Sequence, residues 1–297
     1  MFIKETSLVL FIFALIFISR DVKCQLPKTD LYVAEFKNLA TIPQVSSVKF
    51  LNKFNLNGYN NQAKFFTYND LYLSSGIDTH QITDIYHLQL KKNEIQRITN
   101  TEMISEFSPT LTPHEDFFSV VRIEADRKSQ SLWMYPLDLS NTGYRVLSKL
   151  NNIGYHTWIS KDSVALFLVG SPNTLVVADI KTNKIELITE NAGRCIKIDQ
   201  DGHLIFVHKV RQDLWLLKSY DVKEKSVFSI CQMPANREDF DIMPNGTFIA
   251  SDGAKIKIFN PLKDGEWIEV ADFSNQNIMN IQRIQVLRDR VIFINNY

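Results

Sequence analysis

The sequence has no excess of charge of either sign and very little cysteine. Its 33 lysines and arginines balance 33 aspartates and glutamates, and it contains 3 cysteines in 297 residues. A neutral chain lacks the basic surplus that collects nucleic-acid phosphates by charge alone, so we expect no nucleic-acid partner. So few cysteines cannot form a disulfide framework. A hydrophobic core must therefore supply the stability.

Long apolar runs are also missing, except for one at the start of the chain. Residues 7–18 are almost wholly apolar and follow the basic Lys4. This run is shorter than a membrane-spanning helix, and Val22-Lys23-Cys24 forms an acceptable cleavage site before Gln25. We predict that residues 1–24 are a cleaved signal peptide and that the mature chain is periplasmic or secreted. No second run predicts a membrane span.

Cys24 opens an alternative, in which a lipid attached to this cysteine anchors the chain as a lipoprotein. That modification favours small or apolar residues directly before the cysteine. Asp21-Val22-Lys23 occupy those positions here. Export as a free protein is therefore the favoured interpretation.

The common catalytic signatures are absent as well. The sequence contains no Gly-x-Ser-x-Gly, no His-Glu-x-x-His, no Gly-x-x-x-x-Gly-Lys and no Cys-x-x-Cys. We accordingly predict no catalytic residue, no cofactor and no metal ligand from motifs. This disfavours an enzyme without excluding one.

What the sequence does contain is a repeat of short strands. Apolar residues alternate with polar ones over short segments, and these segments recur in groups of four, as in propeller blades. Six polar turns, typical of hairpins, separate a first from a second strand. They are Asn69-Asp70, His114-Glu115-Asp116, Lys161-Asp162, Asp201-Gly202, Asn245-Gly246 and Arg288-Asp289. The fold class predicted is all-β.

The two ends of the chain each supply half of a blade. Residues 281–287 and 291–295 form only a hairpin before the chain ends, and residues 31–36 and 48–54 precede the first complete unit. Pairing these halves would close a ring and remove its open edges. We predict a single six-bladed β-propeller of four-stranded antiparallel blades over residues 25–297, and we expect a monomer.

The turns carry a resemblance to a known family. The TolB-like, WD40-like propellers repeat a strand that ends in Ser-Pro-Asp-Gly, and this chain has related versions at Ser160-Lys161-Asp162, Asp199-Gln200-Asp201-Gly202 and Met243-Pro244-Asn245-Gly246. Segments around Glu106 and His156 further resemble an uncharacterised exported bacterial subgroup of that family. The resemblance implies the fold but no activity, since the family includes scaffolds, ligand binders and propellers joined to peptidases.

Propeller topology also indicates where a site would lie. The first strand of each blade starts at the channel rim to which the second strand returns, so their polar ends share one face. A ring of converging donors and acceptors suits a peptide, a protein segment or a small polar ligand at the channel mouth. The candidate binding residues are Asn61, Glu106, Arg122, His156, Arg194, His208, Lys209, Glu238, Asp239 and Asn280.

Two other interpretations of this ring stay open. In the first, the charges only satisfy each other, with Glu106 paired to Arg122 and Arg194 paired to Asp239. In the second, the channel holds a cation and hydrolyses a substrate, as six-bladed lactonases do with Glu, Asn and Asp near the axis. Asn61, Glu106, Asp239 and Asn280 could imitate that set.

Cys195 and Cys231 fall on the innermost and outermost strands expected for one blade. Strands in a sheet lie about 4.8 Å apart, so three spacings put these residues about 14 Å apart. A disulfide needs Cα atoms within about 7 Å. We therefore predict two free thiols.

Overall fold

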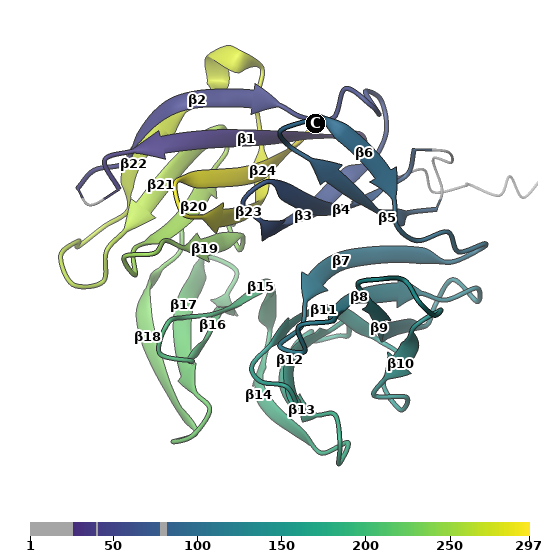
Figure 1. Ribbon diagram of the computed structural model, residues 1–297. Coiled ribbons are helices and arrows are strands. Elements are labelled where there is room, and N and C mark those ends of the chain that lie inside the picture. Colours follow the sequence, from purple (N-terminus) through teal and green to yellow (C-terminus); the bar gives the residue numbers. More distant parts are fainter. Residues whose placement is uncertain (1–25, 40, 78–81) are drawn as a thin grey trace, which may run out of the picture.

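The computed structural model describes residues 26–39, 41–77 and 82–297. The predicted signal peptide and Cys24 lie outside the described residues. Within them the chain forms six four-stranded antiparallel sheets that are arranged in a ring, as Figure 1 shows. The predicted all-β, six-bladed propeller is confirmed. A single short 3-10 turn, Ser274–Gln276, is the sole helical element of the described residues.

Three blades follow the first two strands of the chain. Blade one consists of β3 (Asn60–Thr67), β4 (Asp70–Ser75), β5 (Asp84–Gln89) and β6 (Glu94–Arg97). Blade two consists of β7 (Ser105–Leu111), β8 (Phe117–Ile123), β9 (Gln130–Pro136) and β10 (Tyr144–Val146). Blade three consists of β11 (Ile153–Trp158), β12 (Ser163–Leu168), β13 (Thr174–Asp179) and β14 (Ile185–Glu190).

Two more complete blades come next. Blade four consists of β15 (Ala192–Ile198), β16 (Leu204–Arg211), β17 (Leu214–Asp221) and β18 (Ser226–Gln232). Blade five consists of β19 (Phe240–Ile242), β20 (Phe248–Asp252), β21 (Lys255–Phe259) and β22 (Ile268–Asp272). The innermost strands of blades three and four, which the strand pattern predicts to start at His156 and Arg194, start instead at Ile153 and Ala192.

The sixth, closing blade is built from both ends of the chain. Its strand order is β2-β1-β24-β23, with β1 (Thr29–Lys37) and β2 (Gln44–Phe50) beside β23 (Ile281–Leu287) and β24 (Arg290–Asn296). Antiparallel pairing of β1 with β24 runs from Thr29 opposite Asn296 to Glu35 opposite Arg290. The predicted ring closure is therefore confirmed.

One boundary in the closing blade was wrong. The sequence predicted its outer strand at residues 48–54, whereas β2 begins at Gln44, directly opposite Lys37. The chain leaves the sheet after Phe50 because Leu51 turns inward, where it is buried and its amide donates to Leu31. The side chain of the next residue, Asn52, accepts from the Leu31 amide. This segment therefore bonds to β1 and does not extend β2.

The hydrophobic core lies between neighbouring blades. Leu31 and Ile292 of the closing blade pack with Leu71 and Leu73 of blade one, and equivalent clusters join the other blades. Side chains on both faces of the middle strands are buried, as expected when each sheet is covered on both sides. Burial at these interfaces holds the six innermost strands around a common axis.

Most innermost strands carry a bulge near their start. The pairing register shifts after Asn61 in β3, after Phe107 in β7 and after Gln282 in β23. At each shift one residue other than glycine adopts the left-handed conformation: Gln62 (φ 52°), Ser108 (φ 56°) and Arg283 (φ 54°). Such bulges redirect a side chain out of the regular alternation and are common beside functional sites.

Candidate functional site

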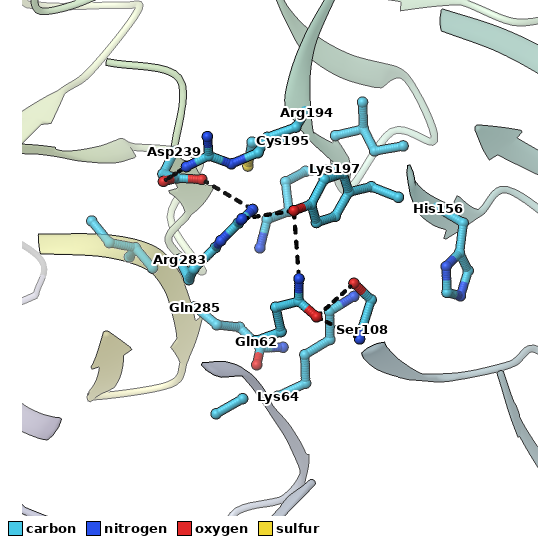
Figure 2. Close-up of a pocket in the computed structure, with 14 residues that line it drawn as sticks. Gln62, Lys64, Ser108, His156, Arg194, Cys195, Lys197, Asp239, Arg283 and Gln285 are labelled. Carbon is cyan, nitrogen blue, oxygen red and sulfur yellow. Dashed lines mark hydrogen bonds and ion pairs between the residues drawn. The ribbon is translucent and has the colours of Figure 1, made fainter. Parts of the chain in front are cut away.

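A cavity of about 80 Å³ lies in the channel at the level of these bulges. All six innermost strands, or the residue directly before them, contribute to its wall, so it must lie on the axis of the ring. One buried water needs roughly 10–15 Å³, so several small groups fit here. Figure 2 shows the lining, whose polar members are Gln62, Lys64, Ser108, Tyr155, His156, Arg194, Cys195, Lys197, Asp239, Arg283 and Gln285.

The left-handed residues point into this cavity and bond to each other across blades. Gln62 of β3 accepts from the Ser108 amide at 2.8 Å and from the Ser108 hydroxyl at 3.2 Å. Gln285 of β23 accepts from the Phe65 amide at 2.7 Å. The bulges thus connect blade one to both of its neighbours through polar contacts.

Tyr155 of β11 also lines the cavity and contacts these residues. Its hydroxyl oxygen accepts from Arg283 Nη2 at 2.7 Å and from Gln62 Nε2 at 3.4 Å. No acceptor for the tyrosine's own hydroxyl proton occurs among the hydrogen bonds of the described residues. Tyr155 therefore presents a free donor to the cavity.

Blades four and five are joined beside the cavity by ion pairs. Arg194 donates to Glu238 and, at 2.7 Å, to Asp239. Lys209 contacts Glu238 at 2.8 Å, and Arg283 lies 4.0 Å from Asp239. Burial by itself would raise the pKa of Asp239, but Arg283 and Arg194 outweigh it and lower that pKa. Asp239 is therefore ionised and neutralised by its partners.

The two cavity lysines differ in their surroundings. Lys197 of β15 pairs with Asp241 at 2.9 Å, and this carboxylate outweighs burial and raises the pKa of Lys197. Lys64 of β3 donates to the Thr110 hydroxyl at 2.8 Å and has no carboxylate within 4.0 Å in the described part of the chain. Burial, with repulsion from Lys197, lowers the pKa of Lys64 to about 8.

His156 of β11 is a third lining side chain with a hydrogen-bonding atom that has no partner among the described residues. It is 3% exposed, and its Nε2 lies 2.7 Å from the Ser119 hydroxyl, which also accepts from Trp158 at 2.9 Å. Its Nδ1 is buried without a hydrogen-bond partner in the described structure. Burial holds the pKa of His156 well below its usual range, so the ring is neutral at neutral pH.

The sequence-predicted ring is partly assembled. His156, Arg194 and Asp239 line the cavity, and Glu238 and Lys209 join them through the ion pairs of Arg194. The expected pairing of Arg194 with Asp239 is present. Whether these residues bind a ligand stays a prediction.

Glu106 and Arg122 lie elsewhere, at the boundary between blades one and two. They are cross-strand neighbours, as predicted, but Tyr135 stands between them: its hydroxyl donates to Glu106 and accepts from Arg122 at 3.2 Å. No direct ion pair joins them in the described structure. Glu106 is completely buried, and burial raises its pKa to about 7.

The remaining predicted residues also lie outside the cavity lining. Asn61 accepts from the amide of its neighbour Gln62, and Asn280 accepts from Arg237 at 2.8 Å. His208 is half-buried on β16. Of the four residues proposed to imitate a lactonase cation site, only Asp239 lines the cavity. Its carboxylate is already paired with Arg194 and Arg283.

Several cavity residues were missed by the sequence analysis, namely Lys64, Ser108, Tyr155, Lys197, Arg283 and Gln285. The sequence analysis did not predict the bulges. Strict alternation of side chains places the wrong residues in the channel, and nothing in the sequence marks a left-handed Ser or Arg. A signal for the lysines did exist. Lys64 and Lys197 are each flanked by apolar residues on a strand nearest the axis.

One group of described residues has the proximity of metal ligands: Asp199, Asp201 and His203. They form the hairpin turn between β15 and β16, where Asp199 already accepts from the amides of Asp201 and His203. This is the bonding of an Asp turn. The proximity of these three side chains is therefore explained by the turn, without a metal ion.

The fold and the channel define a six-bladed β-propeller, and comparison with solved structures finds the same fold in TolB structures. A putative TolB from Agrobacterium tumefaciens superposes with a TM-score of 0.68 at 11% identity, over 92% of this chain and 99% of that one. TolB from Acinetobacter baumannii gives 0.58 at 12% identity, over 89% of this chain and 63% of that chain's length. A chain of a nidogen/laminin complex gives 0.61 at 10% identity, over 90% and 98%. At such identities the likeness establishes the fold alone.

In sequence, no family model and no curated protein matches the chain. The described residues include no helix with the length and apolarity needed to cross a membrane.

Proposed function

We propose that this chain is an exported binding or scaffold module whose channel cavity receives a small polar ligand or the end of a peptide or protein. The observation that carries the proposal is the cavity wall, in which hydrogen-bonding side chains from all six blades converge around one space (Figure 2). A chain of the same fold forms part of a nidogen/laminin complex, which supports a protein partner as one source of the ligand.

A thermal-shift screen with peptides and polar metabolites tests the binding function. We compare the wild type with the double variant His156→Ala, Arg194→Ala, which removes two lining side chains from different blades. The matched control is His203→Ala, Arg211→Ala, on the turn between β15 and β16 and at the end of β16. A ligand that stabilises the wild type and the control but not the cavity variant is expected. If no compound distinguishes the cavity variant from the wild type, the binding proposal is wrong.

Export is proposed from the sequence of residues 1–24 and is tested separately. The full chain, with a carboxy-terminal tag, is expressed in a bacterium, and the periplasmic fraction is analysed by intact mass. We expect the mass of a chain whose first residue is Gln25. The variant Leu15→Arg, which places a charge in the apolar run, should keep the protein in the cytoplasm. A lipid-modified Cys24 would instead support the anchored alternative.

A further inference from the structure

We propose that the channel cavity is a receptor for a carboxylate, with the Lys64 ammonium as its counter-ion. This inference rests on the proposed binding function and names the chemistry of the ligand. The shared chemistry has two possible sources, a small free carboxylate and the carboxy terminus of a peptide.

The charges around the cavity favour an anion. Four cations line it, namely Lys64, Arg194, Lys197 and Arg283, whereas Asp239 is the one carboxylate in the wall. The direct ion-pair partners add Glu238 and Asp241, and Glu238 is shared with a further cation, Lys209. Positive charge is therefore in excess among these residues. Among the described residues, Lys64 is the lining cation that forms no direct ion pair with a carboxylate.

The hydrogen-bonding groups left over are mostly donors. The Lys64 ammonium has three N–H donors, and one of them donates to the Thr110 hydroxyl. Tyr155 accepts twice and keeps its own hydroxyl proton for a partner. The lining carboxylate Asp239 already accepts from Arg194. An acceptor-only ligand such as a carboxylate complements this set, while a cation or a donor-rich ligand does not.

The size and remaining lining of the cavity limit what carries the carboxylate. Ala63, Ile196 and Ile284 contribute apolar wall between the polar groups. About 80 Å³ admits a carboxylate and a short aliphatic part but no folded segment. The ligand should therefore be a small aliphatic acid or the last residue of a chain.

The pKa of Lys64 gives the inference a second readout. A carboxylate beside the ammonium would stabilise its charged form, so affinity should fall as pH rises above about 8. The titratable groups that act on or lie near Lys64 are Lys197 and Cys195 on β15, Asp241 on β19 and His156 on β11. Lys197 is held charged by Asp241, Cys195 has its pKa raised to about 11 and His156 is neutral, so Lys197, Cys195 and His156 should not titrate near pH 8.

The experiment measures binding of matched acids and amides by calorimetry. The probes are butyrate against butyramide, and N-acetyl-trialanine against its carboxy-terminal amide, so the two pairs separate the small acid from the chain terminus. Lys64→Met removes the charge at similar volume, Lys64→Arg keeps it, and Lys255→Met on the outer part of blade five is the control. Circular dichroism and melting confirm that each variant is folded.

We expect at least one acid to bind while its amide does not. Lys64→Met should weaken that acid roughly 10- to 100-fold, as loss of a charge-assisted hydrogen bond does, and Lys64→Arg and Lys255→Met should retain most of the affinity. Equal binding of acid and amide, or unchanged binding by Lys64→Met, would refute the carboxylate inference and leave the binding function standing. Absence of binding by both acids would also refute it, and the ligand screen described above would then decide the binding function independently.

Discussion

Arg194 on β15 donates to Asp239 at 2.7 Å across the boundary between blades four and five. The same guanidinium bonds Glu238, so a single arginine holds two acidic side chains that precede β19. Asp239 is buried, and its carboxylate also lies near Arg283 of the closing blade. This pair therefore helps to fix the relative positions of three blades around the cavity.

Reversing the charge at Arg194 should destabilise the propeller. In Arg194→Glu three carboxylates would face each other, and breaking a buried pair costs on the order of 3 kcal/mol. The double variant Arg194→Glu, Asp239→Arg should recover part of this loss, because Glu238 remains beside the new glutamate. Urea unfolding of the two single variants and the double variant gives the coupling free energy.

Arg211→Glu is the control for this series, since Arg211 is 66% exposed and its one ion-pair partner among the described residues is the exposed Asp213. Exposed pairs contribute about 0–1 kcal/mol, so this variant should unfold like the wild type. If Arg194→Glu were also as stable as the wild type, the ion pair would be irrelevant to folding. The charges would then be available for ligand recognition alone.

Removing the amino-terminal strands should open the ring. A chain that begins at Gly58 lacks β1 and β2 and leaves β24 with an unpaired edge. Exposed edges pair with other chains, so we expect oligomers or precipitate and a lower melting temperature. Size-exclusion chromatography with melting measures this against a chain that begins at Leu26, which keeps both strands. A stable monomer lacking both strands would contradict the role of ring closure.

The two thiols should be free but slow to react in the folded protein. Cys195 on β15 and Cys231 on β18 occupy opposite edges of blade four and are unbonded, as the sequence predicted. Burial raises the pKa of Cys195 to about 11 and that of Cys231 to about 12, so little thiolate forms at pH 8. Alkylation followed by mass spectrometry should find both thiols unmodified in the native protein and both modified in unreduced, denatured protein. Protection of both after denaturation would indicate a disulfide.

The sequence predicted the architecture well because the fold depends on local, repeated signals. Turns such as Asp201-Gly202 and Asn245-Gly246 mark hairpins by their backbone preferences, with both glycines at positive φ, and alternation marks the strands. Ring closure followed from counting strands at the two ends. The error in β2 arose where a local signal was lacking, since the inward turn of Leu51 depends on its packing against the closing blade.

The site was harder to predict because it depends on contacts between blades. Gln62, Ser108 and Arg283 reach the cavity through left-handed bulges, which sequence marks only when the residue is glycine. Glu106 does not line the cavity, because the bulge after Phe107 breaks the alternation by which Glu106 and Ser108 would face the same side of the strand. Arg194 and Asp239, two of the predicted residues, do line the cavity, Arg194 from β15 and Asp239 from the residue directly before β19.

Glu106 should make the stability of the protein depend on pH. Its pKa is raised by burial to about 7 in the folded protein, whereas an unfolded glutamate titrates near about 4.3. The folded state therefore binds this proton more tightly, so stability is highest below about pH 4.3 for this group. It falls as pH rises between these values and is constant above about pH 7.

Glu106→Gln should remove this contribution, because the amide stays neutral at every pH and its oxygen can still accept from Tyr135. Relative to the wild type, the variant should therefore gain stability between pH 5 and pH 8. Melting temperatures at both values, with the exposed Glu266→Gln as control, isolate the group from other titrations. Since Glu106 lies outside the cavity, carboxylate binding should be unchanged. Parallel pH profiles for Glu106→Gln and the wild type would show that Glu106 is already ionised in the folded protein at pH 5, stabilised by Arg122 through the Tyr135 hydroxyl.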